Sequence, residues 1–209
     1  MGGVVMVKVA LFGTMVVAIG FLWAARALVF HVLPLAWTGE ADRLAAFLKI
    51  GPGNRVAEIG AGTGVLAAEM AGRVGPAGAV FATELNPERR AEIARRAARL
   101  PQLAAVEAAP DATKLPFDCC DAIYMRAVLH HIEAPDAYAR QLARAVRPGG
   151  RVGIIDFPPG ALFMHGADHG IDARVVLRAF TAAGLELEGR EDDWGGAMYL
   201  LTFRKPALE

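Results

Sequence analysis

The chain has 209 residues, enough for one domain with a sizeable core, and its 22 lysines and arginines balance 22 aspartates and glutamates. Its zero net charge excludes the strongly basic overall field that is typical of nucleic-acid-binding proteins. Hydrophobic residues make up 55% of the chain, above the usual range for a soluble domain, and the excess lies in the first 37 residues.

An apolar segment opens the chain. The 17 residues Val9–Ala25 carry no charge, and as a helix they would span about 25 Å, slightly less than the bilayer core of about 30 Å. Three interpretations stay open: a transmembrane or embedded anchor, which we favour, a secretory signal peptide, and a helix packed on the domain or on a partner. We therefore expect an N-terminal hydrophobic helix, most simply a transmembrane one, within an anchor segment at residues 1–37.

Beyond residue 37, short apolar strands alternate with helices. A helix from Thr38, as its N-cap, to about Lys49 is expected first. Strands are expected near residues 55–60, 78–85, 103–109, 120–125, 151–157, 185–189 and 197–203. Helices are expected near residues 65–73, 86–100, 135–146 and 172–183. This alternation predicts an α/β fold, a doubly wound Rossmann-like sheet of seven mostly parallel strands, in one domain over residues 38–209.

Two adjacent cysteines, Cys119 and Cys120, are the only ones in the chain. Neighbouring cysteines have poor geometry for a structural disulfide, and they fit no zinc-binding spacing. We expect them to act as small apolar residues at the start of a buried strand.

The stretch "EIGAGTGVLA", residues 58–67, places a glycine at every second position after the first expected strand. Glycines at such a strand–helix turn let the backbone approach a ligand closely. A dinucleotide fingerprint that starts at Gly60 and Gly62 requires a third glycine at position 65, which is Val65. A P-loop requires Gly-Lys-Ser/Thr, which is absent. A methyl-donor nucleoside remains compatible with the spacing.

An acid ends the second expected strand. Glu84 follows Gly64 by 20 residues, where a carboxylate accepts hydrogen bonds from the two hydroxyls of a ribose. The sequence therefore supports a ribose-bearing ligand rather than a pyrophosphate at the glycine turn.

Five motifs in order resemble those of class I S-adenosylmethionine-dependent methyltransferases, of the group similar to ubiquinone- and menaquinone-biosynthesis methyltransferases. They are "VAEIGAGTG", "TEL", "APDATKLPF", "CDAIYMRAVLHHI" and "RPGGRVGIIDF", and the resemblance covers about residues 38–204. It implies an enzyme with S-adenosyl-L-methionine as its cofactor. It implies cofactor contacts at Glu58, Gly60, Ala61, Gly62, Gly64, Glu84, Leu85, Asp111, Ala112 and Met125. Within that set, Glu84 would bind the ribose, and Asp111 and Ala112 would lie on the adenine side.

Catalytic and substrate residues are harder to predict. His130 and His131 follow the fourth strand and are candidates for a base that takes a proton from the acceptor, although such a pair often only starts the next segment. Candidate substrate contacts are Tyr124, Arg126, His165 and His169. We expect no metal, including at the histidines of residues 165–169.

The expected helix after Glu84 carries five arginines: Arg89, Arg90, Arg95, Arg96 and Arg99. The simpler interpretation is a solvated outer face, and the alternative is a basic surface for anionic lipid headgroups.

These observations predict a membrane-associated methyltransferase that acts on a small or lipidic acceptor, with its catalytic domain in the cytoplasm, or exported if the first segment is a signal peptide. Two alternatives are a methyltransferase of a soluble metabolite, with the anchor used only for location, and a cofactor-binding scaffold without catalysis. The sequence leaves the acceptor and the oligomeric state open.

Overall fold

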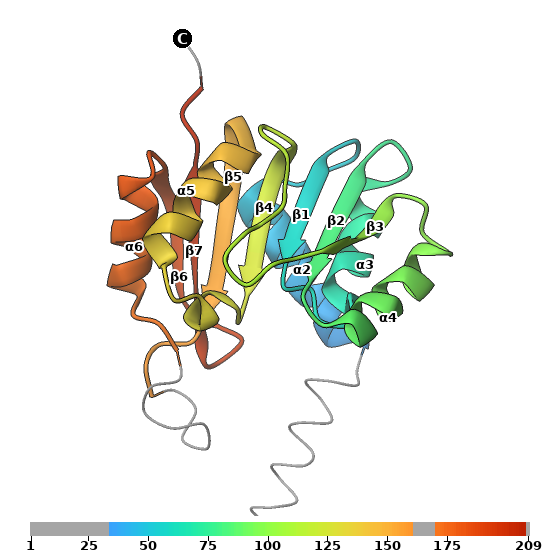
Figure 1. Ribbon diagram of the computed structural model, residues 1–209, viewed down its shortest axis with the longest axis horizontal. Coiled ribbons are helices and arrows are strands. Elements are labelled where there is room, and N and C mark those ends of the chain that lie inside the picture. Colours follow the sequence, from blue (N-terminus) through green and yellow to red (C-terminus); the bar gives the residue numbers. More distant parts are fainter. Residues whose placement is uncertain (1–33, 161–169, 208–209) are drawn as a thin grey trace, which may run out of the picture. The chain divides into compact units, whose positions relative to one another are not determined.

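The computed structural model describes residues 34–160 and 170–207 (Figure 1). The chain divides into two compact units, Met1–Glu40 and Ala41–Glu209, and the boundary falls inside helix α2 (Pro34–Leu48). Nearly all of the expected anchor at residues 1–37 lies outside the described residues, so that prediction stays a prediction. Within the described ranges, no helix has the length and apolar character needed to cross a membrane.

A single sheet of seven strands forms the centre of the second unit, as predicted. The strands are β1 (Arg55–Ile59), β2 (Ala79–Glu84), β3 (Leu103–Glu107), β4 (Cys120–Arg126), β5 (Val146–Asp156), β6 (Glu186–Trp194) and β7 (Met198–Arg204). Their spatial order is β3-β2-β1-β4-β5-β7-β6 (Figure 1). The first five pair in parallel, while β7 runs antiparallel to both β5 and β6.

The strand order reverses between β1 and β4. From β1 the chain moves outward through β2 to β3 and then crosses to β4 on the other side of β1. In open α/β sheets, ligands bind at such a switch point, outside the carboxyl ends of the strands. The segments that follow β1, β2 and β4 are therefore where a site is expected.

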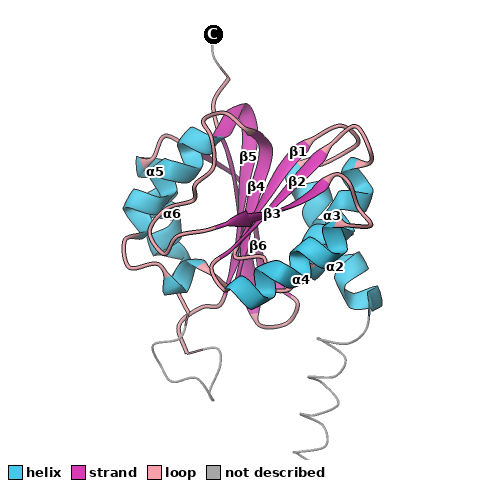
Figure 2. Cartoon of the chain, turned by 45° about the vertical axis from the view of Figure 1, so that its right-hand side comes forward, coloured by secondary structure: helices cyan, strands magenta, loops and turns pink. Residues whose placement is uncertain are grey.

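Helices cover both faces of the sheet. α2 from Ala41 onward, α3 (Val65–Val74) and α4 (Pro87–Ala97) lie on one face, and α5 (Pro135–Ala145) and α6 (Ala173–Ala182) lie on the other (Figure 2). A short 3₁₀ helix, η1 (Leu129–His131), follows β4 and was not expected from the sequence.

The core beneath α5 and α6 is apolar and closely packed. Phe180 of α6 stacks on Phe203 of β7 with ring centroids 4.9 Å apart, and both are fully buried. Leu142 of α5 joins the same cluster. Burying a side chain of this size stabilises the fold by about 1.5–3 kcal/mol, so this layer stabilises the packing of α5 and α6 on the sheet.

Two helix starts follow the sequence prediction. The Asn86 side chain accepts hydrogen bonds from the backbone N–H groups of Glu88 and Arg89 and thereby caps α4. Asp172 caps α6 by accepting from the Arg174 N–H. The first helix differs, since α2 begins at Pro34 and not after Thr38. Proline fits the first turn of a helix because it lacks an N–H that would be unpaired there anyway, and this signal outweighs the capping tendency of Thr38.

Strand β5 begins five residues earlier than predicted. Pro148-Gly149-Gly150 lies between the expected helix and the expected strand, and in the structure it is part of the strand. The Gly149 N–H donates to the Lys205 carbonyl and the Lys205 N–H donates to the Gly150 carbonyl, each at 2.9 Å. Tertiary pairing with the segment after β7 thus overrides the local turn signal.

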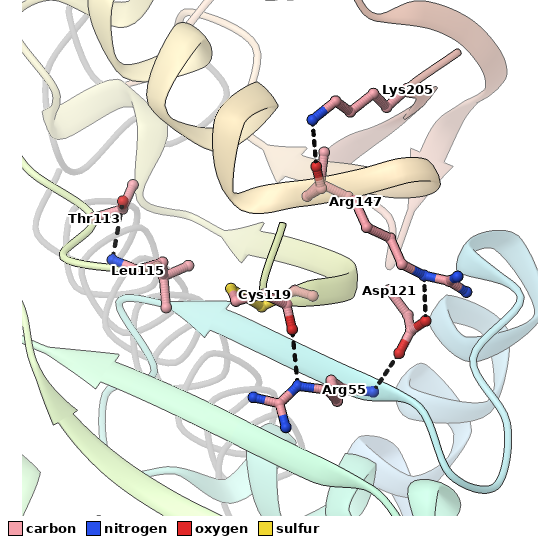
Figure 3. Close-up of a disulfide and its surroundings, with 9 residues drawn as sticks. Arg55, Thr113, Leu115, Cys119, Asp121, Arg147 and Lys205 are labelled. Carbon is pink, nitrogen blue, oxygen red and sulfur yellow. Dashed lines mark hydrogen bonds and ion pairs between the residues drawn. A yellow bond between two sulfur atoms is a disulfide. The ribbon is translucent and has the colours of Figure 1, made fainter. Parts of the chain in front are cut away.

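Cys119 and Cys120 form a disulfide, which corrects the expectation of two free thiols (Figure 3). The expected burial at the start of β4 is confirmed for Cys120, which is fully buried. Because the bond joins neighbours in sequence, it closes almost no loop and adds little chain entropy to stability. Beside it, Asp121 accepts from the Arg55 N–H and pairs with Arg147, and this network joins β1, β4 and β5 at their amino ends, away from the switch point (Figure 3).

Candidate functional site

The glycine turn after β1 adopts a backbone that side chains rarely allow. Gly60, Gly62 and Gly64 have φ angles of 69°, 57° and 77°. A Cβ atom on Gly60 would lie 2.6 Å from Val128 Cγ2, and one on Gly64 would lie 2.8 Å from Ile93 Cγ1. The protein's own packing therefore requires glycine at these two positions.

Gly62 differs from its neighbours because a Cβ atom there would meet nothing within 4 Å. Packing within the protein does not explain this glycine, although its positive φ favours glycine in any case. The turn thus presents bare backbone to open space at its middle position, as the approach of a ligand requires.

Residues at the end of β2 hold the turn in place. The Thr83 carbonyl accepts from the Ala61 N–H at 2.8 Å, and the Thr83 hydroxyl accepts from the Gly60 N–H at 3.3 Å. Glu84 accepts from the Gly62 N–H at 2.8 Å through Oε2 and from the Asn86 N–H at 2.9 Å through Oε1. A carboxylate has about four acceptor positions, so each Glu84 oxygen can still accept from one ribose hydroxyl.

Glu58 lies within the sheet just before the turn. It is 4% exposed and accepts from the Tyr124 hydroxyl of β4 at 3.1 Å. Tyr124 is fully buried, so its hydroxyl orients the Glu58 carboxylate from the neighbouring strand. A substrate contact for Tyr124 stays a prediction.

The predicted adenine side lies beyond β2 and β3. Leu85 directly follows Glu84 and is 51% exposed, which leaves an apolar surface beside the ribose acid. Asp111 and Ala112 lie in the turn after β3, closed by the Ala109–Ala112 bridge. Gln141 of α5 clamps this turn, since its side chain donates to the Asp111 carbonyl at 2.7 Å and accepts from the Thr113 N–H at 3.1 Å.

A histidine–carboxylate pair lies at the carboxyl ends of β4 and β5. His130 Nδ1 is 2.6 Å from Asp156 Oδ1, and the two side chains are 3% and 0% exposed. Asp156 also accepts from the backbone N–H groups of His130, at 3.2 Å, and Phe157, at 2.8 Å. Because a carboxylate oxygen can only accept, the 2.6 Å contact assigns the proton of this hydrogen bond to His130 Nδ1.

The charge on Asp156 also affects its neighbour on β7. Burial, and after it the nearby Asp156 carboxylate, raise the pKa of Tyr199 well above its usual range. The Tyr199 hydroxyl therefore stays protonated and donates to the Ile171 carbonyl at 2.8 Å. This bond fixes the chain at the start of α6.

The structure brings most predicted cofactor residues to one edge of the sheet. Those at or after the carboxyl ends of β1, β2 and β3 are Glu58, Gly60, Ala61, Gly62, Gly64, Glu84, Leu85, Asp111 and Ala112. Met125 is fully buried in the core cluster beneath them. Their roles toward a cofactor remain predictions.

The candidates for catalysis and substrate binding are less closely grouped. His131 is exposed, with its ring centroid 3.9 Å from that of His130. Arg126 ends β4 and is half-buried. His165 and His169 lie outside the described residues. No group of side chains in the described ranges is arranged to hold a metal ion.

Two residues of the site were missed in the sequence. Asp156 ends an apolar strand as Glu84 does, and that same pattern was the signal available for it. Gln141 had no local signal, because its partners lie about 30 positions away in the sequence.

Comparison with known proteins agrees with this arrangement. Residues 57–154 match the family described as a methyltransferase domain. These residues form a class I S-adenosylmethionine-dependent methyltransferase domain. A solved methyltransferase of Aquifex aeolicus, named as dependent on the same cofactor, shares the fold with a TM-score of 0.69 at 18% identity, over 78% of this chain and 88% of that one.

Two curated relatives of the methyltransferase domain are named for quinone biosynthesis. The demethylmenaquinone methyltransferase of Mycobacterium bovis is 36% identical over 121 residues, which are 56% of this chain and 47% of the relative. The ubiquinone/menaquinone biosynthesis C-methyltransferase of Cupriavidus taiwanensis is 32% identical over 108 residues, 51% of this chain and 44% of the relative. The chain thus spans less than half the length of these relatives.

The methyltransferase domain has residues that fit S-adenosylmethionine, the cofactor of its family. Gly62 leaves open space above the turn, Glu84 retains acceptor capacity for a ribose, and Leu85 exposes an apolar surface next to it. The expected cofactor is therefore supported by the family and by the residues of the site.

Proposed function

We propose that this chain transfers a methyl group from S-adenosylmethionine to a small or lipidic acceptor at a membrane. The observation that carries the proposal is the glycine turn, held at Gly62 by Glu84 and open at the same residue. Bound there, the cofactor would supply a methyl group on a sulfonium, ready for direct displacement.

The domain's own residues would position the reactants. The Glu84 carboxylate would accept from the ribose hydroxyls, while Tyr124 orients the Glu58 side chain beside the turn. Positioning of this kind is the main requirement of a displacement that needs no covalent enzyme intermediate.

His130 is the proposed base. With its Nδ1–H directed at Asp156, the neutral ring has its accepting lone pair on Nε2, which could take a proton from an acceptor. Because only 3% of the His130 side chain is exposed, this transfer would occur away from bulk water. Such a base suits an acceptor that loses a proton during methylation, such as a phenol or a compound with an acidic C–H group.

Three features support a membrane-dissolved acceptor. The relatives' names refer to quinone biosynthesis, quinone precursors dissolve in membranes, and the chain opens with the uncharged run Val9–Ala25. We place the domain in the cytoplasm because S-adenosylmethionine is made there. A soluble acceptor, with the first segment used only for location, is the alternative.

Radiolabelled methyl transfer tests the proposal. Full-length protein in vesicles, with S-adenosylmethionine labelled in its methyl group, should label reduced demethylmenaquinone or another component of a bacterial lipid extract. Labelling only of a water-soluble extract would favour the soluble-acceptor alternative. Cofactor binding without labelling of either extract would favour a non-catalytic scaffold.

Asp156→Asn tests the role of the histidine pair. The change should let the protonated nitrogen move to Nε2, and methyl transfer should fall by a factor of a hundred or more with little change in KM. Nitrogen NMR of the His130 ring would report the tautomer directly, even before the acceptor is known. An Nε2–H tautomer in the unmodified protein would contradict the assignment.

Location has its own test. Alkaline phosphatase, which is active only outside the cytoplasm, can be fused to the C-terminus. We expect no phosphatase activity and recovery of the chain with membranes. High activity would contradict the cytoplasmic placement and favour an exported domain.

A further inference from the structure

Helix α4 and the turn after it carry an excess of positive charge. Residues 86–100 contain five arginines and two glutamates, although the chain as a whole is neutral. Arg89, Arg95 and Arg99 are exposed, while Arg90 and Arg96 are half-buried. This segment, on the α2–α3–α4 face of the sheet (Figure 2), therefore has three more arginines than glutamates.

Five arginines elsewhere in the domain lie 2.5–2.6 Å from a carboxylate oxygen: Arg73, Arg147, Arg151, Arg174 and Arg190. The nearest equivalent on α4 is the Arg95–Glu92 pair, at 4.0 Å. Within the described ranges, the Arg89 and Arg99 guanidinium groups make no ion pair. The exposed guanidinium groups of Arg89, Arg95 and Arg99 are thus available to an external anion.

An open hollow of about 400 Å³ gathers three of these arginines. Its lining is Ala68 of α3, then Glu92, Arg95, Arg96, Arg99 and Leu100. Apolar side chains contribute to the wall and guanidinium groups surround it, with Glu92 as the single acid. Arg95 lies in the last turn of α4 and Arg99 in the turn that follows the helix, and both line the same hollow. Guanidinium groups suit phosphate because their planar donors match its oxygens in pairs.

The hollow is joined to the glycine turn. Arg96 Nε donates to the Thr63 carbonyl at 2.9 Å, and Thr63 lies between Gly62 and Gly64. Ile93, on the same helix, packs against Gly64 so closely that a Cβ atom there would lie 2.8 Å away. A ligand at Arg96 would therefore contact the element that supports the turn.

We infer that the hollow on α4 binds the phosphate headgroup of an anionic lipid and docks the domain on a negatively charged membrane. The chain's own uncharged run, Val9–Ala25, favours a lipid surface over a soluble phosphate, because it would keep the domain at high effective concentration near a bilayer. Each arginine at an anionic surface strengthens adsorption by about fivefold. The inference concerns a surface separate from the methyl-transfer site and does not require the acceptor to be a lipid.

Arginine modification tests the inference without interference from the first segment. Full-length protein is reconstituted in vesicles of phosphatidylcholine alone or mixed with phosphatidylglycerol and treated with phenylglyoxal, and each arginine is followed by mass spectrometry. Modification of Arg95 and Arg99 should slow by about fivefold or more in the anionic vesicles. Arg140 of α5 and Arg178 of α6, both exposed on the other face of the sheet, serve as controls and should not change.

Charge variants provide the matched comparison. In the reconstituted full-length protein, Arg95→Gln with Arg99→Gln should reduce the protection of Arg96 by anionic vesicles by about tenfold or more and weaken the salt dependence of this protection. Arg140→Gln with Arg178→Gln removes the same charge elsewhere and should leave the protection of Arg96 unchanged. Equal loss of protection in both pairs, or equal protection in neutral vesicles, would overturn the proposal. Protection by millimolar inorganic phosphate without vesicles, at matched ionic strength, would reassign the hollow to a soluble phosphate.

Discussion

At the scale of single residues, Glu84 joins the fold to the expected cofactor. Its two oxygens already accept from the Gly62 and Asn86 N–H groups, so the side chain fixes the glycine turn before any ligand binds. Being 7% exposed, it is also largely desolvated, which strengthens any further hydrogen bond that it accepts.

Glu84→Gln should weaken the binding of S-adenosylmethionine by about tenfold to a hundredfold. Each lost charge-assisted hydrogen bond contributes about 1.5–3 kcal/mol, while the glutamine retains one oxygen for the turn. Calorimetry measures the dissociation constant, and thermal unfolding checks that the domain remains folded. Glu186→Gln, on exposed β6, is the control. An unchanged dissociation constant for Glu84→Gln would show that Glu84 does not bind the ribose.

The roles of single residues differed in how far the sequence could predict them. Gly62 and Glu84 were accessible because glycine spacing and an acid at a strand end are local patterns. The packing that requires glycine at positions 60 and 64 could not be predicted, because Val128 and Ile93 lie far from these glycines in the sequence. Asp156 was missed although it repeats the pattern of Glu84, because its partner His130 becomes its neighbour only when β4 and β5 pair.

At the scale of elements, α4 supports the turn from outside, and its capping residue sets where it begins. Asn86→Ala removes the acceptor of the Glu88 and Arg89 N–H groups and should lower the free energy of unfolding by about 1 kcal/mol. Urea unfolding measures this loss. Asn86→Asp retains the acceptor and should preserve stability. A loss equally large in Asn86→Asp would contradict the capping role.

Some elements could be predicted from the sequence and others could not. The helices over residues 65–73 and 86–100 were predicted well, because their turns and caps are local. The extension of β5 through Pro148-Gly149-Gly150 was not, since its hydrogen bonds come from Lys205. Neither was the Cys119–Cys120 disulfide, because the strand pattern indicated only burial.

At the scale of the whole molecule, burial makes stability sensitive to alkaline pH. Burial raises the pKa of Tyr138 to about 12, above the value of about 10 in an unfolded chain. The folded state therefore binds this proton more tightly, so its contribution to stability is complete below pH 10 and is lost as pH rises toward about 12. Tyr199 shifts in the same direction.

The urea midpoint should fall steadily between pH 10 and 12 and more steeply than between pH 8 and 9.5. Tyr138→Phe removes one of the titrating groups and should make the fall shallower. A slope that is identical in the variant would contradict the assignment to Tyr138.

The central claim is that the glycine turn binds S-adenosylmethionine. Calorimetry of the full-length protein with S-adenosylmethionine, its demethylated product and NAD tests it most directly, because Val65 stands where a dinucleotide fingerprint has glycine. The account predicts saturable binding of the first two ligands, and at least tenfold weaker binding of NAD. Tighter binding of NAD, or no binding of S-adenosylmethionine by the folded protein, would contradict it.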